Sequence, residues 1–228
     1  MMKPIYKPKG AALEYCDWAL NIYKGCPHAC FYCYCPKVLH KDPKEFFSGA
    51  EARKNIVEEV RKQVEGEKIV DRTIHLCFAG DPYPTGWDST PTREIIKILK
   101  DSGNHVQILT KGDGRRDFDL LDGEDWNGVT IDGLGPEMTF VREIEALREA
   151  RKSGIRTWVS FEPVVDVDNV MQAIRLYHPI FDKVKIGKLN YYPSENNWKE
   201  FGEEVEELCK KVGLEYYIKN SLRMEMEK

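Results

Sequence analysis

The sequence predicts an α/β fold, a partial (β/α)6 TIM-type barrel with a parallel sheet, formed as a single compact domain over residues 1–228 with its core at about 16–218. A unit of strand, turn and helix recurs about every 30 residues, which is the length of a βαβ crossover. Strands that alternate with helices form parallel sheets with right-handed crossovers. An open doubly wound sheet also fits, but six or seven such units favour the partial barrel. In both folds the loops after the carboxyl ends of the strands hold the chemistry.

Short runs rich in β-branched and aromatic residues predict the strands. In chain order they cover residues 19–23, 73–78, 105–110, 128–131, 156–161 and 183–186, with a seventh at 214–218. Helical patterns lie between them. A glycine often provides the left-handed residue that ends a helix. Three glycines follow a helical run and precede a strand: Gly103, Gly154 and Gly213.

Two helix starts are also predicted. Ser48 and Glu51 have the spacing of a capping box, whose side chains satisfy free backbone N–H groups at the start of a helix. Thr90 followed by Pro91 predicts an N-cap and a first helical residue, because proline needs no backbone hydrogen bond there.

The charges of the chain nearly balance. There are 34 Lys and Arg against 38 Asp and Glu, a net charge of −4. The overall field therefore does not attract nucleic acid or an anionic membrane, although a local basic groove is compatible with it. No run approaches the roughly 18 apolar residues of a membrane span, and the first residues lack the apolar core of a signal peptide. We expect a cytoplasmic protein without a membrane partner.

Seven cysteines form an odd set, and four of them lie within ten residues: Cys26, Cys30, Cys33 and Cys35. A disulfide framework is not expected from such crowding in a chain without export signals. The cysteines therefore indicate metal or redox chemistry.

The first three of these cysteines have the spacing C-x3-C-x2-C after the first predicted strand. Thiolates at this spacing can hold three corners of a cuboidal iron–sulfur cluster and leave the fourth iron open to another ligand. Cys35 is too close to Cys33 to reach the opposite corner easily, and the other cysteines are remote in sequence. The alternatives are a zinc site made from the three cysteines and His28, or a set of buried free thiols.

This motif, in a repeating βα chain and with Tyr32 before its last cysteine, resembles the radical S-adenosylmethionine (SAM) superfamily. The resemblance implies a [4Fe-4S] cluster on Cys26, Cys30 and Cys33 whose open iron chelates SAM, with Tyr32 near the adenine. It also implies reductive cleavage of SAM to a 5′-deoxyadenosyl radical that abstracts hydrogen from the substrate. An external electron donor of the flavodoxin or ferredoxin type is implied with it. The protein would mainly orient and shield the reactants.

The later strand ends resemble spore photoproduct lyase and its relatives from about residue 20 to residue 190. The matching segments are Asp81-Pro82-Tyr83-Pro84, Leu109-Thr110-Lys111, Thr130-Ile131-Asp132 and Glu162-Pro163-Val164. The resemblance implies that Gly80 and Asp81 engage the amino group of SAM, that Lys111 pairs with its carboxylate, and that Thr130 places a hydroxyl near it. The alternatives are a turn-starting role for Asp81 before proline and a solvated loop lysine at 111.

Glu162 follows an apolar strand, and a carboxylate aimed into a barrel mouth is costly without a partner. We expect it to act on or bind the substrate or cofactor. Lys188, at the rim after the next strand, is the expected partner of Glu162 and a candidate cofactor contact, and Asn190 occupies the same rim. A structural ion pair is the alternative.

Three side chains are candidates for hydrogen or radical transfer. Cys77 lies near the strand end where the lyases carry a cysteine that returns a hydrogen atom to the product radical. It is displaced by about one position, which turns a strand residue to the opposite face. A buried structural cysteine is therefore the competing interpretation. Tyr83 and Tyr34 are the alternative relays.

The predicted function is a radical SAM enzyme with a lyase-like or isomerase-like reaction on a nucleobase, in nucleic acid or nucleotide form. The loop at 111–116 places three cations among glycines, which could receive a phosphate backbone or be solvated surface charge. The chain is shorter than the lyases and shows no separate carboxyl-terminal module that would clamp a duplex. A peptide or small metabolite is therefore the second hypothesis. A non-catalytic iron–sulfur or zinc protein is the third.

Overall fold

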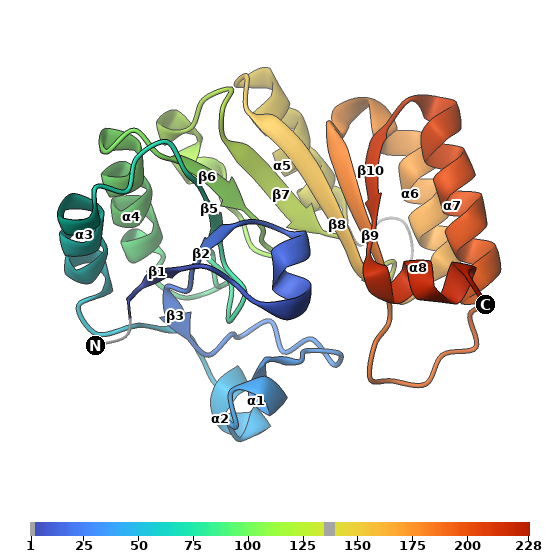
Figure 1. Cartoon of the computed structure of the whole chain (residues 1–228), viewed down its shortest axis with the longest axis horizontal. Helices are drawn as coiled ribbons and strands as arrows, with labels where there is room; N and C mark the ends of the chain where they lie inside the picture. The colour runs from blue at the N-terminus through green and yellow to red at the C-terminus, as the bar shows by residue number, and fades with distance from the viewer. Residues whose placement is uncertain (1–2, 135–139) are drawn as a thin grey trace. The chain divides into compact units, whose positions relative to one another are not determined.

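The structure, a computed structural model, describes residues 3–134 and 140–228 (Figure 1). These residues form an eight-stranded sheet with the order β1-β2-β5-β6-β7-β8-β9-β10 and a two-stranded sheet, β3-β4. The chain divides into two compact units, Met1–Trp126 and Asn127–Lys228. The single domain predicted over the whole chain therefore stays a prediction.

The first unit contains a parallel three-stranded layer with an antiparallel edge. Its strands are β1 (Ile5–Tyr6), β2 (Trp18–Leu20), β5 (Thr73–Leu76) and β6 (His105–Ile108). β1 is antiparallel to β2, and the pairings of β2 with β5 and of β5 with β6 are parallel. Leu76 at the end of β5 lies opposite both Leu20 and Ile108. The loops that follow these strands therefore begin side by side.

Helices and short segments complete the first unit. The long helices α3 (Ile56–Glu67) and α4 (Thr90–Asp101) pack against each other beside the sheet (Figure 1). The small antiparallel pair β3 (Tyr23–Lys24) and β4 (Glu51–Ala52) brackets the cysteine loop. The remaining elements are η1 (Gly10–Glu14), α1 (Cys35–Val38), α2 (Pro43–Phe47) and η2 (Arg115–Leu120).

The second unit contains the later strands. β7 (Trp126–Thr130) begins at the boundary, where Trp126 pairs in parallel with Gln107 of β6. β8 (Arg156–Val164), β9 (Lys183–Lys188) and β10 (Glu215–Ile218) follow, with parallel pairing of β8 to β9 and of β9 to β10. The helical elements are α5 (Val141–Lys152), α6 (Val167–Tyr177), η4 (His178–Ile180), α7 (Trp198–Val212) and α8 (Asn220–Met226).

The core of the second unit is one continuous apolar cluster. Phe161 of β8, Ile186 of β9 and Val205 of α7 are fully buried members of it. The apolar stripes of the helices pack against the buried faces of the strands, and this burial is the main favourable term in folding.

Most sequence-predicted elements are present, with local differences. The first predicted strand, 19–23, overlaps two short strands, β2 and β3, and the other six overlap β5 to β10. Gly103, Gly154 and Gly213 all have left-handed backbones at or just beyond helix ends, as predicted.

The two predicted helix starts differ from the structure. The capping box is wrong, because Ser48 ends α2 and Glu51 pairs with Lys24 in the β3-β4 ladder. Ser89 takes the N-cap of α4, so Thr90 is its first residue instead of its cap.

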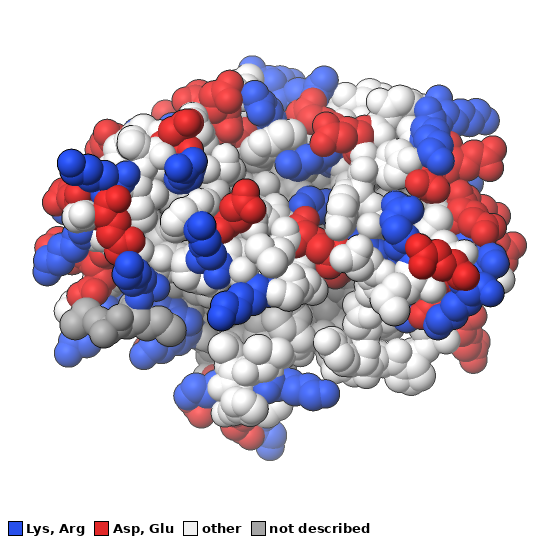
Figure 2. Space-filling model, viewed as in Figure 1, with Lys and Arg blue, Asp and Glu red and all other residues white. Residues whose placement is uncertain are grey.

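The described helices are all too short or too polar to cross a lipid bilayer. Acidic and basic side chains are interspersed on the face shown in Figure 2, in line with the small net charge of −4.

Gly128 provides a test of packing in the second unit. An added Cβ there would lie 2.1 Å from the indole nitrogen of the buried Trp158. We expect Gly128→Ala to lower the free energy of unfolding by about 1–3 kcal/mol, because an overpacked core must shift. Gly66→Ala in α3 is the control, since a Cβ there meets no atom within 4 Å. Urea unfolding followed by circular dichroism compares the two, and equal midpoints would contradict this account.

Candidate functional site

The cysteine loop leaves β3 at Gly25, whose φ is +79°. A side chain there would meet the carbonyl oxygens of Gly49 at 2.3 Å and of Phe46 at 2.8 Å, so the position requires glycine. The backbone N–H of Cys26 donates to the Phe46 carbonyl oxygen over 2.9 Å. The loop is thus held against the end of α2 just before the first predicted ligand.

The thiols of the loop differ in acidity. Burial raises the pKa of Cys26 to about 12, with smaller contributions from the negative charges of Asp81, Cys30 and Cys33. A hydrogen bond from the Cys35 side chain lowers the pKa of Cys33 to about 7, and the same contact raises the pKa of Cys35 above its usual range. The three predicted ligands are half-buried, whereas Cys35 is buried.

Asp81 follows β5, and its buried carboxylate is bonded to several segments. Oδ1 accepts hydrogen bonds from the Thr110 hydroxyl at 2.5 Å and from the Tyr83 backbone N–H at 2.8 Å. Oδ2 accepts from the Lys111 backbone N–H at 2.8 Å and lies 3.5 Å from Nε2 of His28. The hydrogen bond from the Tyr83 backbone forms the turn that the Asp81-Pro82 sequence predicts. The sequence did not predict the hydrogen bond from Thr110 to Asp81. Asp81 therefore joins the loops after β5 and β6 and approaches the cysteine loop.

Lys111 and Tyr32, the predicted contacts of the SAM carboxylate and adenine, lie together. The Lys111 ammonium is 5.5 Å from the centroid of the Tyr32 ring, within the range of a cation–π contact. Gly80, with φ +122°, brings the loop after β5 close to the cysteine loop, since a Cβ there would be 3.2 Å from the Gly25 carbonyl oxygen. Four of the predicted cofactor contacts thus gather beside the cysteines: Tyr32, Gly80, Asp81 and Lys111.

Tyr83 lies beneath the loop at 111–116. Its side chain is buried, and its hydroxyl donates to Oδ2 of the buried Asp117 over 3.0 Å. Burial and the negative charge of Asp117 hold the pKa of Tyr83 well above its usual range. A Cβ at Gly112 would lie 1.8 Å from the Tyr83 carbonyl oxygen, and one at Gly114 would lie 2.8 Å from the ring. These two glycines let the loop pass over the tyrosine.

The arginines of this loop contact acidic side chains. Arg115 makes a two-bonded contact with Asp113, at 2.6 and 2.9 Å. Nε of Arg116 lies 3.2 Å from Asp117, which also accepts a bond from Arg93 of α4 at 2.9 Å. These contacts favour a structural role for Arg115 and Arg116 over phosphate binding.

Cys77 and Phe78 directly follow β5, and Phe78 contacts the cysteine loop. Cys77 is buried, which raises the pKa of its thiol to about 12 and agrees with the structural interpretation of this residue. The carbonyl oxygen of Phe78 accepts from the Tyr34 hydroxyl at 2.9 Å and from the Cys35 thiol at 3.4 Å. Oδ1 of Asn21 accepts from the backbone N–H of Phe78 at 2.9 Å and fixes this segment.

In the second unit Glu162 pairs with Lys219, so the predicted pairing with Lys188 is wrong. The Glu162 carboxylate lies 3.0 Å from Nζ of Lys219, a buried residue that directly follows β10. The pair meets over Gly187 of β9, where a Cβ would lie about 3 Å from both side chains. Neighbouring strand residues point to opposite faces, so Lys188 points away and pairs with Glu225 of α8 instead. A lysine directly after the last predicted strand was the available signal for Lys219.

Thr130 ends β7 and is half-buried, and the side-chain amide of Asn190 donates to the Lys188 carbonyl oxygen over 3.2 Å. Thr130, Glu162 and Lys188 belong to the second unit, whereas the cysteines belong to the first. Their convergence on one site stays a prediction.

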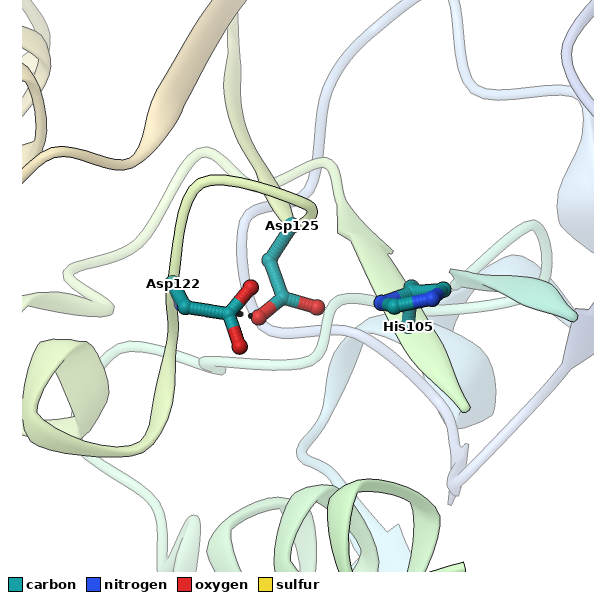
Figure 3. Close-up of side chains that lie close together, drawn as sticks. All are labelled: His105, Asp122 and Asp125. Carbon is teal, nitrogen blue, oxygen red and sulfur yellow. Dashed lines mark hydrogen bonds between the residues drawn. The ribbon is translucent and has the colours of Figure 1, made fainter. Parts of the chain in front are cut away.

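A group of potential metal ligands, His105, Asp122 and Asp125, lies at the amino end of β6 (Figure 3). The Lys100 ammonium contacts Asp125 at 2.6 Å and Asp122 at 2.9 Å. Asp125 also accepts from the Val106 backbone N–H over 2.8 Å. Since the Lys100 ammonium already contacts both carboxylates, the group is a structural ion cluster that links α4 to β6.

The distances between the cysteine sulfur atoms indicate which kind of metal site the cysteines can form. In residues 3–134 and 140–228, the group in Figure 3 is the only set of three or more His, Cys, Asp or Glu side chains whose ligand atoms all lie within 4.8 Å of one another. At least one pair of the Sγ atoms of Cys26, Cys30 and Cys33 therefore lies more than 4.8 Å apart. Zn–S bonds of roughly 2.3 Å bring thiolates to about 4 Å from one another around one zinc ion. Three half-buried thiols whose sulfurs do not all meet around one point suit a cluster in which each thiolate binds a different iron.

Two uncharacterized proteins are similar to this chain in sequence. One, from Mycobacterium tuberculosis, is 31% identical over 120 residues, which cover 50% of this chain and 35% of that protein. The other, from Methanocaldococcus jannaschii, is 27% identical over 176 residues, 72% of this chain and 65% of that protein. The matches span less than two thirds of both relatives.

The fold is similar to that of solved radical SAM enzymes. A mutant of spore photoproduct lyase matches with a TM-score of 0.69 and 10% identity over 93% of this chain and 79% of that one. A double mutant of the lyase with bound AdoMet and dinucleoside spore photoproduct has a TM-score of 0.65 and 11% identity, covering 94% and 78%. Streptococcus suis SuiB bound to S-adenosylmethionine has a TM-score of 0.62 and 9% identity, covering 88% and 46%. The predicted α/β fold of the partial-barrel type is confirmed by these likenesses.

One family model, described as the radical SAM superfamily, matches residues 20–186. This range begins in β2, contains the cysteine loop and ends in β9. Members of this superfamily are enzymes that use an iron–sulfur cluster and SAM. The chain belongs to the radical SAM superfamily.

Proposed function

We propose that Cys26, Cys30 and Cys33 hold a [4Fe-4S] cluster and that the chain cleaves SAM reductively to start radical chemistry on a nucleobase. The observation that carries the proposal is the C-x3-C-x2-C loop beside Gly80, Asp81 and Lys111, three residues from the loops after β5 and β6. An external one-electron donor of the flavodoxin or ferredoxin type would reduce the cluster, and the cytoplasm is the expected compartment.

The cluster with bound SAM would supply one electron that breaks a sulfur–carbon bond and gives a radical able to abstract hydrogen from an unreactive C–H group. The residues of this chain bind and orient the cofactor. The Lys111 ammonium, next to the Tyr32 ring, would pair with the carboxylate of SAM while the ring stacks on the adenine. Gly80 contributes backbone at close approach, and Asp81 holds Lys111 through its backbone N–H.

Three further residues are proposed for the steps on the substrate. Cys77, kept protonated by burial, retains the S–H hydrogen that a hydrogen-atom donor needs. Tyr83, hydrogen-bonded to Asp117, is the alternative donor. Glu162, with Lys219, is proposed to bind the substrate, and Thr130 to contact the cofactor.

The nucleobase is favoured by the likeness to spore photoproduct lyase, which has been solved with a dinucleoside spore photoproduct. A peptide is the second candidate, because SuiB, solved with its precursor peptide SuiA, has a TM-score of 0.64 against this chain.

The proposed ligands are tested by Cys26→Ala, Cys30→Ala and Cys33→Ala in protein reconstituted with iron and sulfide without oxygen. Each variant should lose most of its iron and at least about 100-fold in 5′-deoxyadenosine release after dithionite and SAM, since a vacated corner destabilises the cluster. Cys209→Ala is the matched control, because Cys209 is a buried thiol of α7 in the second unit. Release of 5′-deoxyadenosine that survives all three changes would refute the ligand assignment.

The proposed role of Lys111 is tested through SAM affinity. Lys111→Met should weaken SAM binding by about 10- to 100-fold, because a charge-assisted hydrogen bond contributes roughly 1.5–3 kcal/mol. Equilibrium dialysis with labelled SAM measures the effect. Lys62→Met on exposed α3 is the control and should leave the affinity unchanged. Equal dissociation constants for the two variants would remove Lys111 from the site.

The thiol acidities predict a pH dependence in the metal-free chain. The thiolate is the reactive form of cysteine, so alkylation of Cys33 should rise as the pH passes about 7, while Cys26, with a pKa of about 12, should react slowly until the solution is strongly alkaline. Peptide mass spectrometry after brief iodoacetamide treatment reports both sites. Faster labelling of Cys26 than of Cys33 at neutral pH would contradict the assigned acidities.

A further inference from the structure

The side chain of Asn21, which directly follows β2, bonds to the loop after β5. Its Oδ1 atom accepts hydrogen bonds from the backbone N–H groups of Phe78 at 2.9 Å and of Ala79 at 2.8 Å. Both residues lie beyond Leu76, the last residue of β5, so the hydrogen bonds of the sheet do not satisfy these N–H groups. Partly buried backbone donors need an acceptor, and Asn21 provides one for two successive residues.

The amide of Asn21 is fixed in one orientation. Its oxygen faces the two backbone donors, so its nitrogen points the other way and donates to the Tyr6 hydroxyl over 2.7 Å. Leu20 and Ile22, the residues on either side of Asn21, are fully buried and hold its backbone in place. The side chain is therefore a firm bridge from β1 and β2 to the loop after β5.

The segment that Asn21 holds directly precedes Gly80, whose backbone is proposed to meet SAM. A Cβ at Gly80 would lie 3.2 Å from the Gly25 carbonyl oxygen, so this backbone passes close to the cysteine loop. The Phe78 carbonyl oxygen accepts from the Tyr34 hydroxyl of that loop at 2.9 Å. The segment is thus bonded to Asn21 through its N–H groups and to the cysteine loop through a carbonyl. A shift of the segment would move Gly80 relative to the proposed cluster ligands.

We propose that Asn21 is a positioning residue for SAM: by accepting from Phe78 and Ala79, it holds the backbone of Gly80 where the amino group of the cofactor binds. Because the loop is ordered before SAM arrives, binding does not bear the cost of ordering it. This inference rests on the proposed function, since it requires SAM beside the cysteine loop. It assigns Asn21 no contact with SAM or with iron.

The test compares Asn21→Ala, which removes the acceptor, with Asn21→Asp, which keeps an oxygen for both N–H groups. Each variant and the wild type are reconstituted anaerobically, assayed for iron and thermal unfolding, and dialysed to equilibrium against labelled SAM. We expect Asn21→Ala to keep its iron but to bind SAM about 10-fold more weakly, because two backbone donors lose their acceptor. Asn21→Asp should bind SAM within about threefold of the wild type, since a carboxylate accepts the same hydrogen bonds.

Asn104→Ala is the matched control. Asn104 directly precedes β6 and makes the same kind of bridge at the amino end of the strands. Its Oδ1 accepts from the Arg72 backbone N–H at 3.2 Å, and its Nδ2 donates to the Ile69 carbonyl oxygen at 2.8 Å. We expect Asn104→Ala to lower the midpoint of thermal unfolding, as Asn21→Ala does, and to leave the affinity for SAM unchanged.

Four results would overturn the inference. They are equal SAM affinities in Asn21→Ala and the wild type, an equal weakening in Asn104→Ala, weak binding that persists in Asn21→Asp, and loss of iron in Asn21→Ala. The second would trace the effect to general stability, and the fourth to assembly of the cluster.

If Asn21→Ala does not fold, Tyr6→Phe replaces it, because it removes only the hydroxyl that fixes the amide. It should weaken SAM binding by about threefold, and an unchanged affinity would then overturn the inference. If the wild type itself binds no SAM, the proposed function fails. That result is distinct from a wild type that binds SAM as tightly as Asn21→Ala does.

Discussion

The buried carboxylate of Asp81 is the interaction on which the site of the first unit depends. It accepts hydrogen bonds from Thr110 and Lys111 after β6, and it lies 3.5 Å from His28 in the cysteine loop. A buried charged group without donors is costly, by more than the roughly 1–3 kcal/mol of an unsatisfied neutral group. The three loops therefore gain stability only when they come together around this carboxylate. That arrangement places the Lys111 ammonium beside Tyr32.

Close backbone approach is the second requirement, and glycines meet it. Gly25, Gly80 and Gly112 each lie where a side chain would press on the backbone of another loop. Several of the most constrained positions of the site therefore carry no reactive group of their own. They let the loops that hold the cysteines and Lys111 approach one another. In the second unit Gly187 instead leaves room for the side chains of Glu162 and Lys219.

The sequence predicts what depends on local pattern. The order of strands and helices follows from repeated apolar runs and glycine stops, and the cysteine loop follows from its spacing. Contacts between segments that are far apart in the sequence could not be predicted in this way. Lys219 replaces Lys188 as the partner of Glu162 because Phe161 and Ile218 both lie opposite Ile186 in the sheet, which places the next residues across Gly187. The predicted capping box of Ser48 and Glu51 is wrong because Glu51 pairs with Lys24 in the β3-β4 ladder.

Mössbauer spectroscopy of protein reconstituted with iron-57, recorded before and after the addition of SAM, tests the central claim most directly. Three thiolates leave one iron of a cuboidal cluster without a protein ligand, so a minor component, one iron in four, should change its spectrum when SAM binds while the rest keep theirs. A spectrum that SAM does not alter, or one without a four-iron cluster, would contradict the account of Cys26, Cys30 and Cys33 as its ligands.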